Sequence, residues 1–198
     1  MSNPLFIAGL TGFGAVGLIS ANQLIQTSEA KLFAELHSPY LPDYVIVNNT
    51  GIIRLPKYSF YYSKTLDRDI IILTGDAQPS AEYLKAHYQM CSMALDLAIE
   101  NGCQLVITMG GFPNPNPKKK IYLAATDASL IDKFRDDEAE TYVRGRIIGA
   151  TGLLLGLSKI KGIDGLCVLG VTKGLAADYE AGKAVFDFVM RLIKRIKI

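Results

Sequence analysis

The sequence is poor in the side chains that most metal and catalytic centres use. Its 198 residues contain two histidines, three cysteines and no tryptophan. Two histidines cannot form a three-histidine metal site. His37 lies beside Ser38-Pro39 in a predicted loop and His87 lies inside a predicted helix, so neither is well placed as the base of a serine triad. We therefore expect no metal, no catalytic residue of these classes and two structural histidines.

The three cysteines exclude a disulfide framework. Cys91, Cys103 and Cys167 are odd in number, far apart and in no CxxC pair. Cysteines in this pattern are typical of small buried apolar residues in a reducing compartment. We expect all three to be free and buried.

Several signatures of ligand and polymer binding are also missing. The sequence contains no GxSxG elbow, and Gly182-Lys183 lacks both the upstream glycine and the following hydroxyl of a phosphate-binding loop. The net charge of +2 provides no strong field for nucleic acid or an anionic membrane. We expect no cofactor, no nucleic-acid partner and no membrane partner.

The first 28 residues carry no charge, which gives them the hydropathy of a signal sequence or membrane span. The run contains Pro4 and four glycines, and no positive residue precedes it as a signal peptide requires. A buried parallel strand followed by a core-facing helix produces the same hydropathy. We favour that interpretation and expect a cytoplasmic protein.

A glycine-rich turn is the most distinctive stretch that is present. Gly12-Phe13-Gly14-Ala15-Val16-Gly17 follows the apolar run 5–10 and precedes a predicted helix over 18–27. Its spacing matches the dinucleotide fingerprint, which also needs an acidic residue about 20 positions further on, after a second strand. The next predicted strand, 44–47, ends in asparagines, and Glu29 and Glu35 fall in sequence that we interpret as helix. A close-packed strand–turn–helix is therefore favoured over a nucleotide site.

Apolar strands and helices alternate along the rest of the chain. The patterns predict strands at 44–47, 52–55, 69–73, 105–108, 121–125 and 166–169, and helices at 80–101, at 153–162 and from Tyr179 onward. Ser80 is expected to cap the second helix and Gly102 to follow its end, whereas 132–146 is expected to be helix and solvated loop. The alternation predicts one α/β domain over 1–198, a three-layer α/β/α sandwich with a mostly parallel sheet.

Five predicted strands end in glycine or threonine. Since ligands of such folds bind beyond the carboxyl ends of the strands, we expect these ends to form one crevice at the rim of the sheet. Three aspartates follow the turns and could act there as acid or base, or could instead cap backbone N–H groups. The candidate crevice residues are Gly12, Gly14, Thr74, Asp76, Gln78, Gly110, Gly111, Thr126, Asp127 and Asp178.

Six motifs follow one another along nearly the whole chain. They are GFGAVG at 12–17, GIIRLP at 51–56, LTGDAQP at 73–79, TMGGF at 108–112, ATD at 125–127 and GATGLLLGL at 149–157. In this order they resemble an archaeal member of the PAC2 family, which comprises the proteasome assembly chaperones and their relatives. The resemblance implies a sandwich similar to that of purine nucleoside phosphorylases, a homo-oligomer without established catalysis, and binding to α-subunits of the 20S proteasome.

The resemblance also directs attention to the C-terminal tail. In several family chaperones the tail that docks on the proteasome consists of a hydrophobic residue, a tyrosine and any residue. Here the candidate partner-binding tail reads Ile196-Lys197-Ile198, with lysine where the tyrosine would lie. A cation would replace the ring and hydroxyl in the docking pocket, which argues against docking by this tail.

Two functions remain open at this point. The first is a non-enzymatic homo-oligomeric binding protein, chaperone-like, that binds proteasome α-subunits during assembly. The second is a small-molecule enzyme, similar to a nucleoside phosphorylase or hydrolase, that acts at the strand ends. The 49% hydrophobic composition leaves apolar surface for a subunit contact, and the missing catalytic set also favours the first function.

Overall fold

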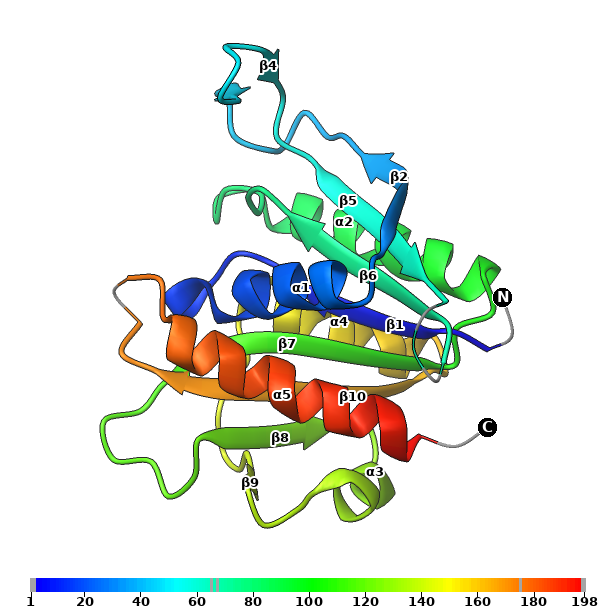
Figure 1. Cartoon of the computed structure of the whole chain (residues 1–198), viewed down its shortest axis with the longest axis vertical. Helices are drawn as coiled ribbons and strands as arrows, with labels where there is room; N and C mark the ends of the chain where they lie inside the picture. Colours follow the sequence, from blue (N-terminus) through cyan, green and yellow to red (C-terminus); the bar gives the residue numbers. More distant parts are fainter. Residues whose placement is uncertain (1–2, 65, 67, 175, 197–198) are drawn as a thin grey trace.

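An eight-stranded sheet forms the centre of the protein in a computed structural model, which describes residues 3–64, 66, 68–174 and 176–196 (Figure 1). The strand order is β2-β5-β6-β1-β7-β10-β8-β9. The bounds are β1 Leu5–Gly9, β2 Lys31–Leu36, β5 Tyr58–Ser63, β6 Ile70–Gly75, β7 Leu105–Pro113, β8 Ile121–Ala125, β9 Ala139–Thr141 and β10 Asp164–Thr172.

The four central strands, β6, β1, β7 and β10, are parallel to one another. Ile7 of β1 pairs with Ile72 on one side and Ile107 on the other, and all five residues of β1 and all six of β6 are buried. Strands covered on both faces read as continuous apolar runs, which explains the 5–9 and 70–73 patterns. β5 and β8 flank this group and run antiparallel to it.

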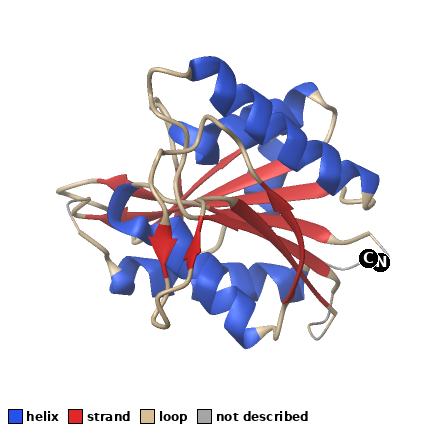
Figure 2. Ribbon diagram, turned by 90° about the horizontal axis from the view of Figure 1, so that it is seen from above, coloured by secondary structure: helices blue, strands red, loops and turns tan. Residues whose placement is uncertain are grey.

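Helices cover both faces of the sheet, which confirms the predicted three layers (Figure 2). The 3-10 turn η1 (Phe13–Ala15) leads into α1 (Val16–Thr27), which packs with α5 (Tyr179–Arg195) on one face. α2 (Leu84–Glu100) and α4 (Gly149–Ile160) pack together on the other. The short α3 (Ala128–Phe134) lies next to β8.

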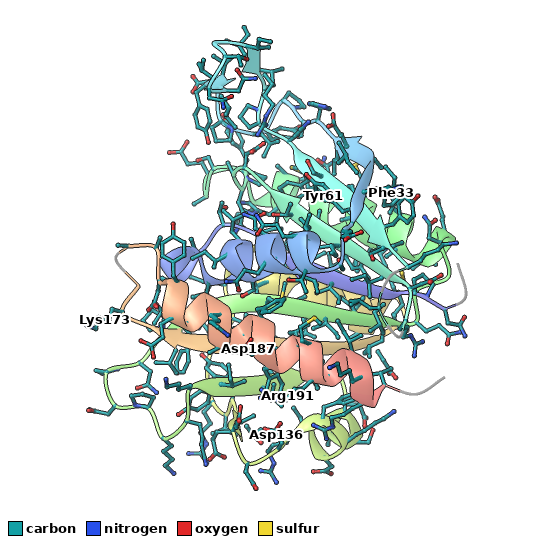
Figure 3. All side chains as sticks on the ribbon, in the orientation of Figure 1. Phe33, Tyr61, Asp136, Lys173, Asp187 and Arg191 are labelled. Carbon is teal, nitrogen blue, oxygen red and sulfur yellow. The ribbon has the colours of Figure 1, made fainter. Side chains whose placement is uncertain are left out.

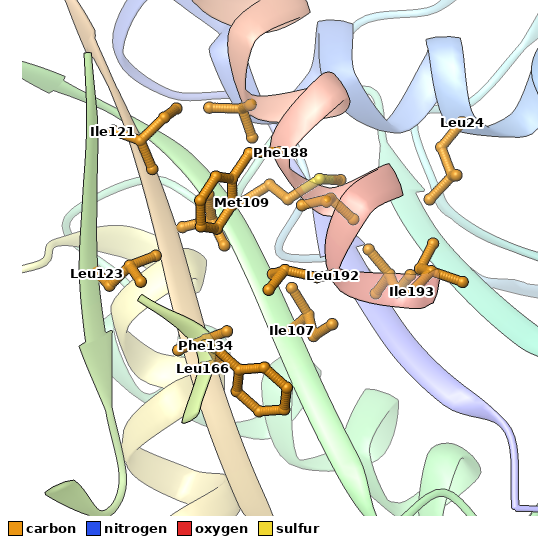
Figure 4. Close-up of a cluster of buried hydrophobic side chains, with 14 of the residues drawn as sticks. Leu24, Ile107, Met109, Ile121, Leu123, Phe134, Leu166, Phe188, Leu192 and Ile193 are labelled. Carbon is orange, nitrogen blue, oxygen red and sulfur yellow. The ribbon is translucent and has the colours of Figure 1, made fainter. Parts of the chain in front are cut away.

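The larger apolar cluster lies under α1 and α5 (Figure 4). Phe188 and Leu192 of α5 lie among Ile107 and Met109 of β7 and Phe134 of α3. The predicted spacing of α5 is observed, because Val185, Phe188, Val189, Leu192 and Ile193 are all buried. A stripe at i, i+3 and i+4 buries one helix face and leaves the other in water.

A second, two-stranded sheet stands away from these layers, beyond β5 (Figure 1). Its strands are β3 (Ile46–Val47) and β4 (Ile53–Arg54), joined by a turn in which Asn48 Oδ1 accepts from the backbone N–H of Thr50 and of Ile52. We call residues 44–55 the apolar arm. Its exposed apolar side chains are Tyr44, Val45, Val47, Ile52, Ile53 and Leu55.

Several segments differ from the sequence-based expectation, and one of them is strand β5 (Tyr58–Ser63), which was not predicted. Residues 31–36 form strand β2 rather than a continuation of the first helix, because Glu29 adopts a left-handed φ of 49° and ends α1 after Thr27. α2 begins at Leu84 with Tyr83 as its N-cap, so Ser80 does not cap it. The 132–146 region contains the end of α3 and strand β9.

The local predictions for Gly102 and for the three cysteines are confirmed. Gly102 follows the C-cap of α2 with φ of 82°, the conformation in which glycine is favoured after a helix. Cys91, Cys103 and Cys167 are free and buried. Within the described ranges, no helix is both long and apolar enough to cross a membrane.

Candidate functional site

A cavity of about 340 Å³ opens beyond the carboxyl ends of β1 and β7. We call it the rim cavity. It lies between the turn 10–13, the end of β7 and the segment 142–151 that leads into α4. Four of the predicted crevice residues line it, namely Gly12, Gln78, Gly110 and Gly111.

Gln78 joins two walls of the rim cavity. Its side-chain Nε2 donates to the carbonyl of Thr11, after β1, and its Oε1 accepts from the backbone N–H of Ala150 at 2.8 Å, in the first turn of α4. The N-cap residue of α4, Ile148, makes no side-chain cap hydrogen bond. Gln78 therefore supplies from a distant loop the acceptor that a capping side chain would otherwise provide.

The glycines of the 12–17 motif serve close packing at two of three positions. A Cβ on Gly17 would lie 2.4 Å from the Met109 carbonyl oxygen, so glycine lets α1 approach β7. Gly14 has φ of 60° and lies against Thr172 and Asp178. The packing interpretation of the motif is confirmed at both residues.

Asp178 caps α5 and does not line the rim cavity. Its Oδ1 accepts from the Ala181 N–H at 3.0 Å, and its Oδ2 accepts from the Thr172 hydroxyl at 2.8 Å. The hydrogen bond from the Ala181 backbone, followed by that from Thr172, lowers the pKa of Asp178 in spite of burial. This is the capping alternative that the sequence left open.

Asp76, directly after β6, binds Arg54 of the apolar arm. Its carboxylate accepts from both terminal nitrogens of Arg54, at 2.6 and 2.7 Å, and from the Lys57 backbone N–H at 3.0 Å. Partial burial alone would raise the pKa of Asp76, but the hydrogen bonds from Arg54 and Lys57 outweigh it and lower the pKa. Asp76 and its neighbour Thr74, which is buried in β6, lie outside the lining of the rim cavity.

Thr126 and Asp127 lie at the amino ends of the parallel strands, opposite the rim cavity. Their predicted place in the crevice is therefore wrong. They follow β8, which runs antiparallel to β10, and the Thr126 N–H donates to the carbonyl of Gly165 near the start of β10. Asp127 caps α3 through the Ser129 N–H at 2.9 Å. In the structure β7 continues to Pro113, so only residues 114–120 connect it to β8, fewer than the dozen or so that a crossover between parallel strands needs. The predicted strand 105–108 left twelve residues before Ile121, so the sequence pattern did not show this.

Arg146, Ile147 and Ile148 line the rim cavity and were not predicted. Arg146 ends the 132–146 stretch that we interpreted as helix and solvated loop, and Ile147 and Ile148 lie between that stretch and the motif at 149–157, where no element was predicted. Arg146 is the single charged residue among the described lining residues. In the described ranges, no cluster of three or more histidine, cysteine, aspartate or glutamate side chains could hold a metal ion.

The acidic run near residue 136 pairs with α5. Arg191 approaches Asp136 at 4.0 Å, and both residues are labelled in Figure 3. Arg191 also forms an ion pair with Glu138. Arg195 donates to the carbonyls of Phe134 and Lys133 at 3.1 and 2.9 Å. These exposed contacts hold the 132–141 segment on the body and place its carboxylates outside the lining of the rim cavity.

The predicted tail is described only at its first residue. Ile196 packs, partly buried, against the larger apolar cluster just after α5. Lys197 and Ile198 lie outside the described residues. The expectation about tail docking therefore stays a prediction.

A sequence profile of the PAC2 family matches residues 6–198. The chain belongs to the PAC2 family. It is 30% identical over 195 residues to the uncharacterized protein MJ1210 of Methanocaldococcus jannaschii, covering 97% of this chain and 74% of that protein.

Solved structures of PAC2 relatives agree with this assignment. The chain resembles PbaB of Pyrococcus furiosus, described as an archaeal proteasome activator, with 36% identity and a TM-score of 0.91 over 100% of this chain and 86% of PbaB. It also shares the fold of Pyrococcus furiosus PbaA, an archaeal homolog of a proteasome-assembly chaperone. That match has 20% identity and a TM-score of 0.81 over 100% of this chain and 80% of PbaA.

Proposed function

We propose that this PAC2-family chain is a non-enzymatic, homo-oligomeric binding protein of the cytoplasm that acts as a chaperone-like factor for α-subunits of the 20S proteasome. The observation that carries the proposal is the 36% identity with PbaB over the full chain, because PbaB is a protein that acts on proteasomes. The shared fold with PbaA agrees with this role.

The apolar arm supports self-association. From Tyr44 to Ile53 it contains no charged side chain, and several of its apolar side chains are more than half exposed. Contiguous exposed apolar patches on soluble proteins commonly mark protein interfaces. The missing charge favours an apolar partner surface, and we propose a second copy of this chain as that partner.

The base of the arm is held before any partner arrives. Asp76 binds Arg54 through two hydrogen bonds, and Lys57 pairs with Glu35 of β2. An interface element that is already ordered loses less conformational entropy when it binds. The arm is therefore suited to a defined contact between subunits.

A second candidate function follows from the description of PbaB. A factor similar to PbaB would bind the assembled 20S particle and raise its peptide hydrolysis, rather than act during assembly. The enzymatic alternative has less support, because Asp76, Asp127 and Asp178 are each engaged in structural hydrogen bonds and none of them lines the rim cavity.

The test begins with multi-angle light scattering of the purified chain, where we expect an oligomer. The chain is then mixed with α-subunits of its own organism and separately with the assembled 20S particle. Co-elution with free α-subunits supports the assembly role, whereas binding to the particle with faster hydrolysis of a fluorogenic peptide supports the activator role. A monomer that co-elutes with neither would contradict the proposal.

A further inference from the structure

The described lining of the rim cavity carries positive charge and no negative charge. The exposed Arg146 is its single charged lining residue, and among the ion pairs of the described residues none involves the Arg146 guanidinium. The three aspartates nearest in sequence to the strand ends lie elsewhere, so no lining carboxylate neutralises this cation. A ligand that enters the cavity would be favoured by a negative charge.

The walls of the rim cavity are largely apolar and aromatic. Phe13, Phe112, Tyr142, Ile147 and Ile148 all contribute to them. The Phe112 ring packs edge-on against Tyr142 and against Tyr122, with centroids 5.1 Å apart in both pairs, so its position is fixed from two sides. Small-molecule sites typically combine such apolar walls with a few polar groups.

Gly12 leaves space in the cavity without a structural need for glycine. Its φ of 174° is extended backbone that any residue adopts, and a Cβ built on it would meet nothing within 4 Å. At Gly111, by contrast, a Cβ would lie 2.1 Å from the Phe13 carbonyl oxygen. A side chain at position 12 would therefore occupy open space at the cavity and leave the packing of the turn unchanged.

The volume and charge limit the ligand class. A cavity of about 340 Å³ lies at the small end of ligand pockets, which span roughly 300–1,000 Å³. One guanidinium matches one carboxylate in two parallel hydrogen bonds. A phosphate monoester would bring close to two negative charges, which a single arginine would leave incompletely neutralised.

We propose that the rim cavity binds a small organic carboxylate with an apolar or aromatic body, Arg146 holding the carboxylate while Phe13, Phe112 and Ile148 contact the body. The carboxylate belongs either to a free acid or to the C-terminal residue of a peptide, which share this chemistry. The inference goes beyond the proposed proteasome role and does not depend on it.

Isothermal titration calorimetry of the full chain with matched probes tests the proposal. The free-acid probe is 3-phenylpropionate and its neutral partner is 3-phenylpropionamide. The peptide probe is N-acetyl-Ala-Ala-Phe with a free carboxylate, compared with its C-terminal amide. We expect each acid that binds to bind at least about tenfold more tightly than its amide, because the charge-assisted hydrogen bonds are lost. Tighter binding of the tripeptide acid would assign the site to chain termini, and tighter binding of 3-phenylpropionate to a free acid.

Two variants locate the binding site. Arg146→Gln removes the cation and should weaken acid binding by about tenfold or more. Gly12→Val should also weaken it, because an isopropyl group would occupy part of the space open to the ligand. Arg144→Gln removes an exposed charge outside the cavity lining, and Gly156→Ala adds a methyl to another open glycine, so both should bind as the parent chain does. Unchanged thermal unfolding of Gly12→Val shows that its fold is intact.

Three results would overturn the proposal. The first is that neither acid binds up to millimolar concentration. The second is that acids and amides bind equally well. The third is that binding persists undiminished in Arg146→Gln or in a folded Gly12→Val chain. None of these outcomes depends on whether the chain binds proteasome subunits.

Discussion

The central sheet and the apolar arm contain the same kinds of side chain and differ in what covers them. Ile70, Ile71 and Ile72 of β6 are fully buried between helices on both faces, whereas Ile52 and Ile53 of the arm are 66% and 62% exposed. An apolar pattern thus accompanies a strand in both β6 and the arm. Whether its side chains are buried depends on the helices that cover the sheet. The arm remains an apolar surface that the described residues leave exposed.

The largest expected effect is a loss of stability when a side chain buried between the sheet and its helices is truncated. Phe188→Ala on α5 removes a ring that is 1% exposed in the larger cluster, and we expect the free energy of unfolding to fall by about 3–5 kcal/mol. Denaturant unfolding followed by circular dichroism measures this loss. Met93→Ala on the exposed side of α2 is the control and should change stability little; a comparable loss there would contradict the layer assignment.

Substitution of the uncovered region should change assembly rather than folding. The double variant Ile52→Ser, Ile53→Ser should convert the expected oligomer to a smaller species in light scattering. The free energy of unfolding of the subunit should change by no more than about 0.5 kcal/mol per site, because both side chains already face water. Ile160→Ser, at a residue that is 81% exposed on α4, is the matched control. An unchanged oligomer in the arm variant would exclude the arm as the subunit contact.

Acid should weaken contacts that hold the turns and the base of the arm. The folded-state pKa values of Asp76 and Asp178 are lowered, so the stability that these groups contribute is complete above the unfolded pKa of about 3.9 and is lost as pH falls through the lower folded values. We expect the free energy of unfolding to decline below about pH 4.

The variant Asp178→Asn tests the acid prediction. It retains an oxygen for the Ala181 N–H but cannot titrate, so its stability should fall less steeply in acid. Asp164→Asn, at an exposed position at the start of β10, should keep the parent slope. Equal slopes for all three chains would show that Asp178 does not contribute.

The smallest expected effect is the reactivity of the three cysteines buried around the central sheet. Burial raises the pKa of Cys91, Cys103 and Cys167 to about 12, and all three thiols are buried. A thiol reagent such as Ellman's reagent should therefore react with no cysteine of the native chain at neutral pH and with all three after denaturation. Rapid reaction of the native chain would indicate local opening near α2 or β10.

The layers were predictable from the sequence because the central strands and α5 carry their patterns locally. The predicted runs 5–10 and 69–73 and the i, i+3, i+4 stripe of α5 each follow from neighbouring residues alone. Strand β2 was not predicted because the chain leaves the helix after Thr27 through Glu29, a non-glycine residue in left-handed conformation that gives no sequence sign of a break.

The candidate site was predictable only in part. Gly12 follows β1, and Gly110 and Gly111 lie in the last half of the parallel strand β7, so their approach to one rim followed from the strand pattern. Asp76 could not be assigned, because its partner Arg54 lies on a hairpin whose direction depends on tertiary contacts. Arg146 reaches the cavity through a segment without periodic pattern, where only the fold determines which side chains form a wall.

The amide of Gln78 makes its position unusually intolerant of replacement. Its oxygen must accept a hydrogen bond from the Ala150 N–H and its nitrogen must donate one to the Thr11 carbonyl, at a reach set by the length of the side chain. Glutamate would lack the donor, asparagine is one methylene shorter, and methionine would offer neither group. During evolution, the turn after β1 and the entrance of α4 are thereby constrained to vary together, since one side chain sets the separation of both.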